Sequence, residues 1–256
     1  MLIILKIIAI IPFGYVIVSR VRKFQDVIHL VVTQFVPGVF LTYKLGNSSL
    51  ALSGAGYFSG YIAFLSIYEV GYLANDAWDA KSKDGGRLRL PFTVDIMFLI
   101  PFFTIRLVTW YLLTVKWQPI GDLKWIVMSL TLAVVFALHN LVKNDSFRIA
   151  TFVQLTILRF CMPIFFAIGV KSASQIMMLS SIVYLHFRSL AYLDSKKLLI
   201  MPVRKEKKFG IIEIVLFFPI LSLLSYIESE SMYLELWLYF VSLYSAYLIK
   251  SKKSVG

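Results

Sequence analysis

Two aspartates, Asp76 and Asp79, lie three residues apart where an apolar stretch gives way to a polar segment. In a helix, residues three, four and seven apart share a face. The same face carries four further polar or aromatic residues, namely Asn75, Tyr72, Glu69 and Tyr68. Proteins commonly hold Mg²⁺ with one or two carboxylates together with the phosphates of a substrate. The spacing therefore predicts a magnesium site formed by Asp76 and Asp79, with Asn75, Tyr72 and Glu69 near the substrate. The alternative is a solvated helix end, although Glu69, deeper in the apolar run, favours a functional site.

Basic residues follow this stripe and recur later in the chain. Lys83 and Arg87 come directly after it, and we expect them to hold the same phosphate group. Lys143 and Arg148 lie where one apolar stretch ends and the next begins, and we expect them to contact the substrate as well. Arg159 lies about 12 Å inside its stretch if the rise is 1.5 Å per residue. That depth makes snorkelling to the membrane surface difficult, so Arg159 is expected to have a catalytic role or a buried partner.

Three more polar positions belong to a later stretch. Arg188 lies one turn inside it, Tyr192 shares its helical face, and Asp194 follows in the next loop. We expect Arg188 to be catalytic and the other two to bind substrate, although an arginine at this depth can also snorkel to the membrane surface. For Arg106 two possibilities stay open, a pairing with Glu69 or a position near the far membrane surface.

The elements that must position these residues are membrane-spanning helices. The chain has 256 residues, of which 59% are hydrophobic, and its mean hydropathy is +0.79. A soluble domain of this composition would have too little polar surface to face water. The apolar runs are continuous rather than alternating, which favours helices over strands, and each is long enough to cross a bilayer. They cover residues 2–19, 27–45, 56–74, 93–113, 123–142, 151–170, 174–192, 210–227 and 231–249.

The basic residues indicate how these helices are oriented. Of the 26 lysines and arginines, eighteen lie in alternate loops and in the C-terminal tail, whereas the opposite loops and helix ends hold four. Cytoplasmic loops carry the excess of basic residues in membrane proteins. We therefore expect an integral protein of the bacterial cell membrane whose site faces the cytoplasm. The net charge of +12 does not indicate nucleic-acid binding, because the bases form short clusters and no recognition motif is present.

The first apolar stretch is ambiguous. It lacks the basic start and the small-residue cleavage site of a signal peptide, so we expect it to be retained. It either spans the membrane or lies in the interface as an anchor. We accordingly expect residues 1–23 to form an N-terminal apolar helix or anchor and residues 24–256 to form a single transmembrane domain. The lone Cys161 excludes an internal disulfide.

The segment Asn75-Asp76-Ala77-Trp78-Asp79 resembles the N-D-x-x-D motif of the UbiA superfamily of intramembrane prenyltransferases. In that family the motif follows the second core helix and a second polar loop follows the sixth, and residues 24–249 have the same layout. The resemblance implies an all-α polytopic membrane helix bundle of about eight or nine transmembrane helices around a central cavity open to the cytoplasm. It also implies Mg²⁺, held by Asp76 and Asp79, and a diphosphate donor whose prenyl group is transferred to an acceptor.

The chain departs from the family pattern at two places. Lys83 stands where the family's first motif has a further aspartate, and Asp194 is the only carboxylate in the second loop before Glu206. The intramembrane arginines fit a donor and an acceptor that both carry phosphate, which points to the branch that transfers phosphoribose to polyprenyl phosphate. Three hypotheses therefore remain: prenyl transfer from a polyprenyl diphosphate, phosphoribosyl transfer, and a non-catalytic lipid-binding or transport protein. The partners expected are a polyprenyl lipid substrate, a diphosphate donor and membrane lipids, and the sequence does not determine the oligomeric state.

Overall fold

The computed structural model describes residues 2–21, 23–81, 89–118, 123–206 and 208–253, with the side chains of residues 78–81, 205 and 250–253 outside that description. Within these ranges the chain is an all-α polytopic helix bundle, as predicted, and no described residue is in a strand. Eight helical segments are long and apolar enough to cross a membrane. They run over Phe24–Gly46, Leu50–Ala77, Ile96–Trp117, Leu123–Leu141, Asp145–Ile168, Ala173–Ser195, Phe209–Glu228 and Met232–Ile249.

These segments match the eight later apolar stretches of the sequence, which confirms the prediction of an integral membrane protein. Their outer faces carry large apolar side chains, among them Leu107, Leu112 and Leu130, each of which is more than half exposed. Exposed apolar surface on this scale is stable only against lipid. Two segments contain a short π-helix, η1 (Val31–Phe35) and η2 (Ser181–Leu185).

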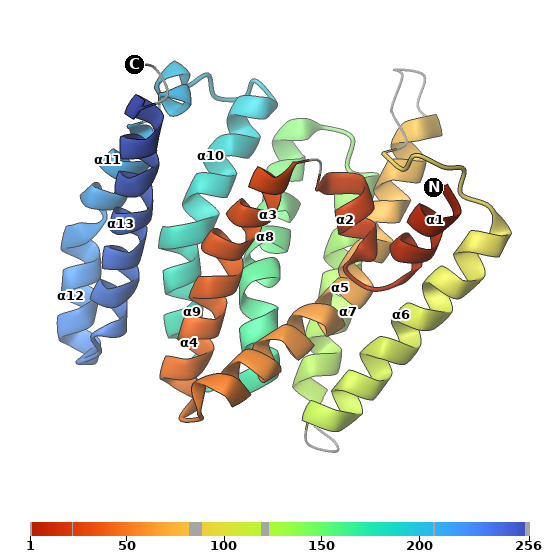
Figure 1. The fold of residues 1–256 in the computed structure, drawn as a ribbon, viewed down its shortest axis with the longest axis horizontal. Helices are drawn as coiled ribbons and strands as arrows, with labels where there is room; N and C mark the ends of the chain where they lie inside the picture. Colours follow the sequence, from red (N-terminus) through yellow and green to blue (C-terminus); the bar gives the residue numbers. More distant parts are fainter. Residues whose placement is uncertain (1, 22, 82–88, 119–122, 207, 254–256) are drawn as a thin grey trace. The chain divides into compact units, whose positions relative to one another are not determined.

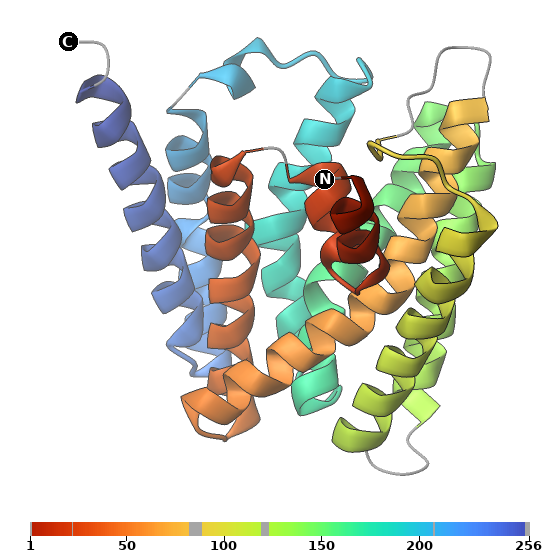
Figure 2. The same ribbon diagram turned by 45° about the vertical axis from the view of Figure 1, so that its right-hand side comes forward.

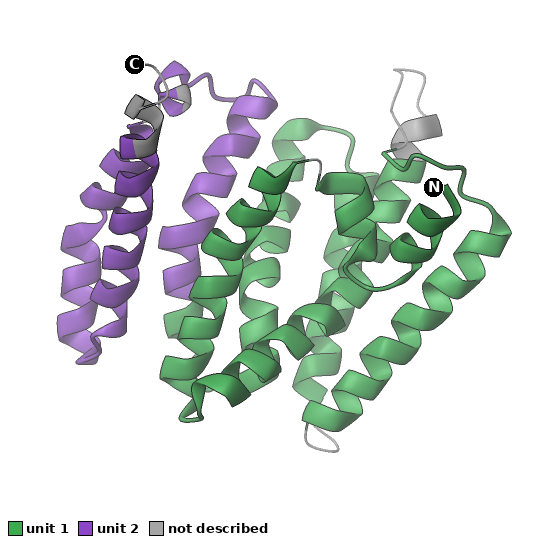
Figure 3. Ribbon diagram, viewed as in Figure 1, with its two compact units in different colours: residues 1–176 green, residues 177–256 purple. Residues whose placement is uncertain are grey.

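The chain divides into two compact units, residues 1–176 and residues 177–256 (Figure 3). Unit 1 contains α1 (Leu2–Ile10), α2 (Gly14–Arg20), α3 (Phe24–Leu30), η1, α4 (Val36–Gly46), α5 (Leu50–Lys81), α6 (Ile96–Trp117), α7 (Leu123–Leu141), α8 (Asp145–Ile168) and the start of α9 (Ala173–Ser180). Unit 2 contains the rest of α9, η2, α10 (His186–Ser195), the short 3₁₀ helix η3 (Pro202–Lys205), α11 (Phe209–Leu216), α12 (Phe218–Glu228) and α13 (Met232–Lys253).

In unit 1 the long helix α5 is central, since it packs against α4, α6, α7 and α8. The α2–α3 connection, the C-terminal part of α5 and the start of α8 lie at one end of the unit, and the α4–α5 turn and the end of α6 lie at the other (Figures 1 and 2). The basic residues of the α2–α3 and α7–α8 connections are therefore at the same end as the predicted site, which agrees with the charge pattern of the sequence.

The first apolar stretch is not one helix. Residues 2–20 form two short antiparallel helices, α1 and α2, joined by a turn at Ile11–Phe13 (Figure 1). We call α1, the turn and α2 the N-terminal hairpin. Phe13 has a positive φ of 78°, and a Cβ on Gly14 would overlap the carbonyl oxygen of Ile8, so only glycine permits this close turn. The stretch predicted as an N-terminal apolar helix or anchor is thus two helices, because local backbone geometry and buried polar partners break the apolar run.

Candidate functional site

The C-terminal half of α5 carries the predicted polar stripe into the interior of unit 1. Asp76 is 1% exposed, although it lies near the end of the helix. Its Oδ2 accepts a hydrogen bond of 2.6 Å from the hydroxyl of Tyr15, and its Oδ1 accepts one of 2.9 Å from Arg20. The Nε of Arg89 lies 3.9 Å from Oδ1. Both oxygens of this buried carboxylate therefore have donors, two of which belong to helix α2.

Arg159 reaches the same part of α5 from helix α8. Its Nε donates to the side-chain oxygen of Gln34 at 3.1 Å, and one of its terminal nitrogens donates to the hydroxyl of Tyr72 at 3.3 Å. The side-chain nitrogen of Gln34 donates in turn to the Arg159 carbonyl at 3.1 Å. Gln34 is fully buried and lies on the π-helix η1, a distortion that often marks functional sites. Arg159 thus has a buried amide partner, which is one of the two possibilities that its depth suggested.

Two further arginines approach the stripe. Arg148, in the first turn of α8, donates to the side-chain oxygen of Asn75 at 3.5 Å, and Asp145 lies 3.7 Å from its guanidinium. The guanidinium of Arg20 lies over the ring of Tyr72, 4.5 Å from its centre. Such stacking is favourable because the face of the ring is negative. The structure thus brings Asp76, Asn75 and Tyr72 together with a group of arginines, Arg20, Arg89, Arg148 and Arg159, which we call the arginine cluster.

Some donors of this cluster have no acceptor within the described part of the chain. They are Nη1 of Arg20 and Nε of Arg148, both buried. A buried N–H group without a partner is costly, and in native proteins it commonly marks the place of a ligand, an ion or water. The arginines also outnumber the carboxylates beside them. This arrangement suits a group with several negatively charged oxygens, which guanidinium groups bind in a planar, bidentate manner.

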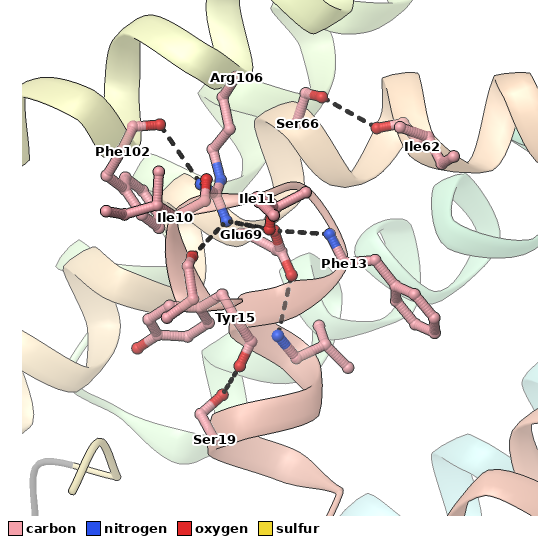
Figure 4. Close-up of polar contacts among 12 residues, drawn as sticks. Ile10, Ile11, Phe13, Tyr15, Ser19, Ile62, Ser66, Glu69, Phe102 and Arg106 are labelled. Carbon is pink, nitrogen blue, oxygen red and sulfur yellow. Dashed lines mark hydrogen bonds and ion pairs between the residues drawn. The ribbon is translucent and has the colours of Figure 1, made fainter. Parts of the chain in front are cut away.

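Glu69 lies deeper in α5 and pairs with Arg106 of α6, which resolves the alternative that the sequence left open for Arg106. Their closest atoms are 2.5 Å apart, and both side chains are at most 1% exposed. Glu69 also accepts from the backbone N–H groups of Phe13, at 3.1 Å, and Val16, at 2.8 Å (Figure 4). Arg106 donates to carbonyls at the end of α1 and in the turn, those of Ala9, Ile10 and Ile11. All these partners belong to the hairpin, so the pair fastens the hairpin to α5 and α6.

The hairpin is also attached through the middle of α1. Lys6 donates to the carboxylate of Asp95 at 2.7 Å, and Asp95 caps the start of α6 by accepting from the Phe98 N–H group. The hydrogen bond from Lys6, together with that from Phe98, holds the pKa of the Asp95 carboxyl below its usual range. Asp95 therefore stays ionised at neutral pH and marks a polar level at this end of α6.

Several predicted site residues have no described contact with the stripe, or belong to unit 2, or lie outside the description. Lys143 is exposed in the α7–α8 connection. Arg188, Tyr192 and Asp194 belong to unit 2, where Asp194 is paired with Arg204 at 2.5 Å. Lys83 and Arg87, and the side chain of Asp79, lie outside the described residues.

The described side chains do not by themselves fit a Mg²⁺ site. The two oxygens of Asp76 already accept hydrogen bonds from protein donors, and Asp79, the second expected ligand, is not among the described side chains. Within the described part of the chain no three His, Cys, Asp or Glu side chains are close enough to share a metal ion. The guanidinium donors around the stripe are of the kind that suits an anion.

Sequence reasoning missed Tyr15, Arg20, Gln34 and Arg89 as members of the site. Gln34 gave a usable signal, because an amide within an apolar span is expected to find a polar partner on another helix. Arg20 gave none, since an arginine at the end of an apolar stretch is typical of topology signals. Comparison with family models, with curated proteins and with solved structures finds no match. The function is therefore argued from the site.

Proposed function

We propose that this chain is an intramembrane transferase that binds the phosphate or diphosphate group of its substrate at the arginine cluster. The observation that carries the proposal is the convergence of Arg20, Arg148 and Arg159 on one face of α5, together with buried N–H groups of Arg20 and Arg148 that have no acceptor among the described residues. In the first form of the proposal the substrate is a polyprenyl diphosphate and the product carries its prenyl group on an acceptor. The enzyme then belongs to the bacterial cell membrane and its site faces the cytoplasm.

The chemistry asked of the cluster is electrostatic. When the bond between the prenyl carbon and the diphosphate oxygen breaks, the electron pair stays on the diphosphate and negative charge develops there. Positioned guanidinium groups in a site with little water stabilise that charge, and they need no rearrangement as it forms. The prenyl carbon becomes cationic, and the rings of Tyr68 and Tyr72, 4.8 Å apart, supply negative faces beside the cluster. The acceptor then forms the new bond to that carbon.

A second candidate is phosphoribosyl transfer from phosphoribosyl diphosphate to a polyprenyl phosphate. One observation favours it: four arginines, Arg20, Arg89, Arg148 and Arg159, contact the stripe of α5 or its neighbours, whereas the described carboxylates beside them are Asp76 and Asp145. Two phosphate-bearing substrates need more cationic groups than one. In either reaction, binding of Mg²⁺ would need Asp79 together with Asp76. The binding assay therefore compares each ligand with Mg²⁺ and with a chelator.

Binding to purified protein in lipid nanodiscs tests the proposal. The ligands are a polyprenyl diphosphate, phosphoribosyl diphosphate and a polyprenyl monophosphate, each with Mg²⁺ and with a chelator. Arg159→Gln should weaken binding of the true donor at least about tenfold, since a hydrogen bond to a charged group contributes about 1.5–3 kcal/mol. The affinity of Arg159→Lys should lie between those of the wild type and Arg159→Gln, because an ammonium group keeps the charge but cannot reproduce the forked donors of a guanidinium.

Lys116→Gln is the matched control, since it removes one positive charge from an exposed site at the end of α6, away from the cluster. It should bind like the wild type. A donor that is bound and then consumed when acceptor is added decides between the two reactions. If the wild type binds none of the three phosphate compounds, or if Arg159→Gln binds them with wild-type affinity, the proposal fails and the non-catalytic alternative is left.

A further inference from the structure

The N-terminal hairpin reaches deep into unit 1 and returns to the same end. Arg106 lies eleven residues after the polar level marked by Asp95, which is about 16 Å along α6 at 1.5 Å per residue. The guanidinium of Arg106 reaches back one turn to the Phe102 carbonyl and donates to the carbonyls of Ala9, Ile10 and Ile11, so the tip of the hairpin lies about 10 Å along α6 from Asp95. Because the hydrocarbon core of a bilayer is about 30 Å thick, the tip lies inside the core without crossing it.

The depth explains why two charged side chains are buried at the tip. The last carbonyls of α1 and the first N–H groups of α2 have no partners within their own helices. Lipid cannot satisfy them, so non-helical backbone at this depth must find protein partners. Arg106 supplies donors to the end of α1, and Glu69 supplies acceptors to the start of α2, while the two side chains neutralise each other.

From this anchored tip, α2 carries two side chains to the site. Tyr15 is fully buried against the ring of Phe102 and donates to Asp76, and Arg20, at the end of the helix, donates to the other oxygen of the same carboxylate. The Nη1 of Arg20 remains without an acceptor among the described residues. This guanidinium is thus held by its hydrogen bond to Asp76 and by stacking on the ring of Tyr72. Its Nη1 group is available for an anion.

We propose that the N-terminal hairpin is a re-entrant element that completes the anion site, with Arg20 as a phosphate-binding residue and Glu69 and Arg106 as positioning residues that hold the hairpin in place. The ligand is the phosphate group of the proposed function, and the inference rests on that function. Glu69 and Arg106 act through Arg20, because all their contacts given above are to the hairpin, to α6 or to each other.

Cysteine labelling tests the re-entrant path without reference to any activity. In a Cys161→Ala background, single cysteines are placed at the exposed Ile3, at Lys23 and at Asn47 in the α4–α5 turn, and are treated with an impermeant maleimide from either side of sealed vesicles. Ile3→Cys should react from the same side as Lys23→Cys and from the opposite side to Asn47→Cys. Reaction of Ile3→Cys from the side of Asn47→Cys would show a spanning helix and overturn the proposal.

Ligand affinity tests the roles of the residues. The probes are inorganic pyrophosphate and a polyprenyl diphosphate, measured on the full chain in nanodiscs. Arg20→Gln and Glu69→Gln should each weaken binding about tenfold or more. In Glu69→Gln, but not in Arg20→Gln, a cysteine at the buried position Ser19 should become reactive, because the hairpin is released.

A covalent rescue separates positioning from direct binding. Cysteines replacing Lys6 and Asp95, whose side chains touch, are joined by a short bifunctional maleimide to hold the hairpin on α6. The cross-link should restore affinity to Glu69→Gln and leave Arg20→Gln weak. If the cross-link rescues neither variant, the positioning role of Glu69 is wrong. If the wild type binds neither probe, the proposed function fails, whereas wild-type affinity in Arg20→Gln overturns only the role of the hairpin.

Discussion

At the scale of single residues, two acidic side chains of α5 that lie seven positions apart have different surroundings. Glu69 is paired with Arg106 and accepts from backbone N–H groups of the hairpin, so its charge stabilises a chain turn inside the bundle. Asp76 accepts hydrogen bonds from Tyr15 and Arg20, and the Nη1 group of that arginine has no acceptor among the described residues. Removing one partner of a buried pair leaves an uncompensated charge, so both carboxylates are expected to tolerate substitution poorly.

Gln34 gives the sharpest prediction at this scale. Gln34→Leu removes both the acceptor for Arg159 Nε and the donor to the Arg159 carbonyl, and it should lower the free energy of unfolding by about 1–3 kcal/mol. Gln34→Glu keeps the acceptor and should cost less, since it adds a charge opposite a guanidinium. Chemical unfolding in detergent measures both values. Equal stability of the leucine variant and the wild type would show that the amide does not hold Arg159.

At the scale of the elements, α5 positions the site because it packs closely against four other helices. Small residues in membrane helices allow such approach, since lipid provides no hydrophobic drive for association and close contact must supply the attraction. Gly71 lies between Glu69 and Tyr72 and faces the ring of Phe136 on α7, which is buried. The register of the polar stripe therefore depends on this contact, since the same Phe136 ring also packs against Tyr68 and Tyr72 of the stripe.

Two glycines of α5 make a matched pair for a test. A Cβ at position 71 would overlap the ring of Phe136, whereas a Cβ at position 54 meets nothing within 4 Å. Gly71→Ala should destabilise the protein by about 1–3 kcal/mol, the usual cost of overpacking. Gly54→Ala should be neutral or stabilising by up to about 1 kcal/mol, because alanine favours the helix. Thermal unfolding in lipid nanodiscs compares the two, and equal effects would contradict the packing described for Phe136.

At the scale of the whole molecule, eight candidate spans and a strong excess of basic residues in alternate connections give one arrangement in the membrane. The first span starts at the end that carries Lys23, and an even number of spans returns the chain to that same side. We therefore expect the C-terminal tail, which is also basic, to share a side with the α7–α8 connection.

Reporter fusions test this arrangement. A fluorescent protein that folds only in the cytoplasm should be bright when fused after Asn144 or after Gly256 and dark after Asn47. A phosphatase that is active only outside the cytoplasm should give the reverse pattern. Phosphatase activity after Asn144 would invert the topology and move the arginine cluster to the other face of the membrane.

The sequence by itself determined the fold class, the apolar stretches long enough to span a membrane and most of the polar stripe, but it left open whether residues 2–19 span. The length and continuous apolar composition of a stretch are enough to predict a membrane-spanning helix. In lipid, a single segment can satisfy its backbone hydrogen bonds only by forming a helix. Helical periodicity is enough to align Tyr72, Asn75 and Asp76, because their spacing on one helix is local geometry.

Only the tertiary structure decided which groups meet that stripe. Arg20 and Gln34 come from segments 40 or more residues before Asp76 and Arg159, and nothing in their own spacing reveals the contact. The first apolar stretch folds back because Glu69 and Arg106, on two other helices, satisfy backbone groups at its turn. Such partners are far apart in the chain and become adjacent only through packing. The length of an apolar stretch alone therefore predicts one helix where the molecule has two.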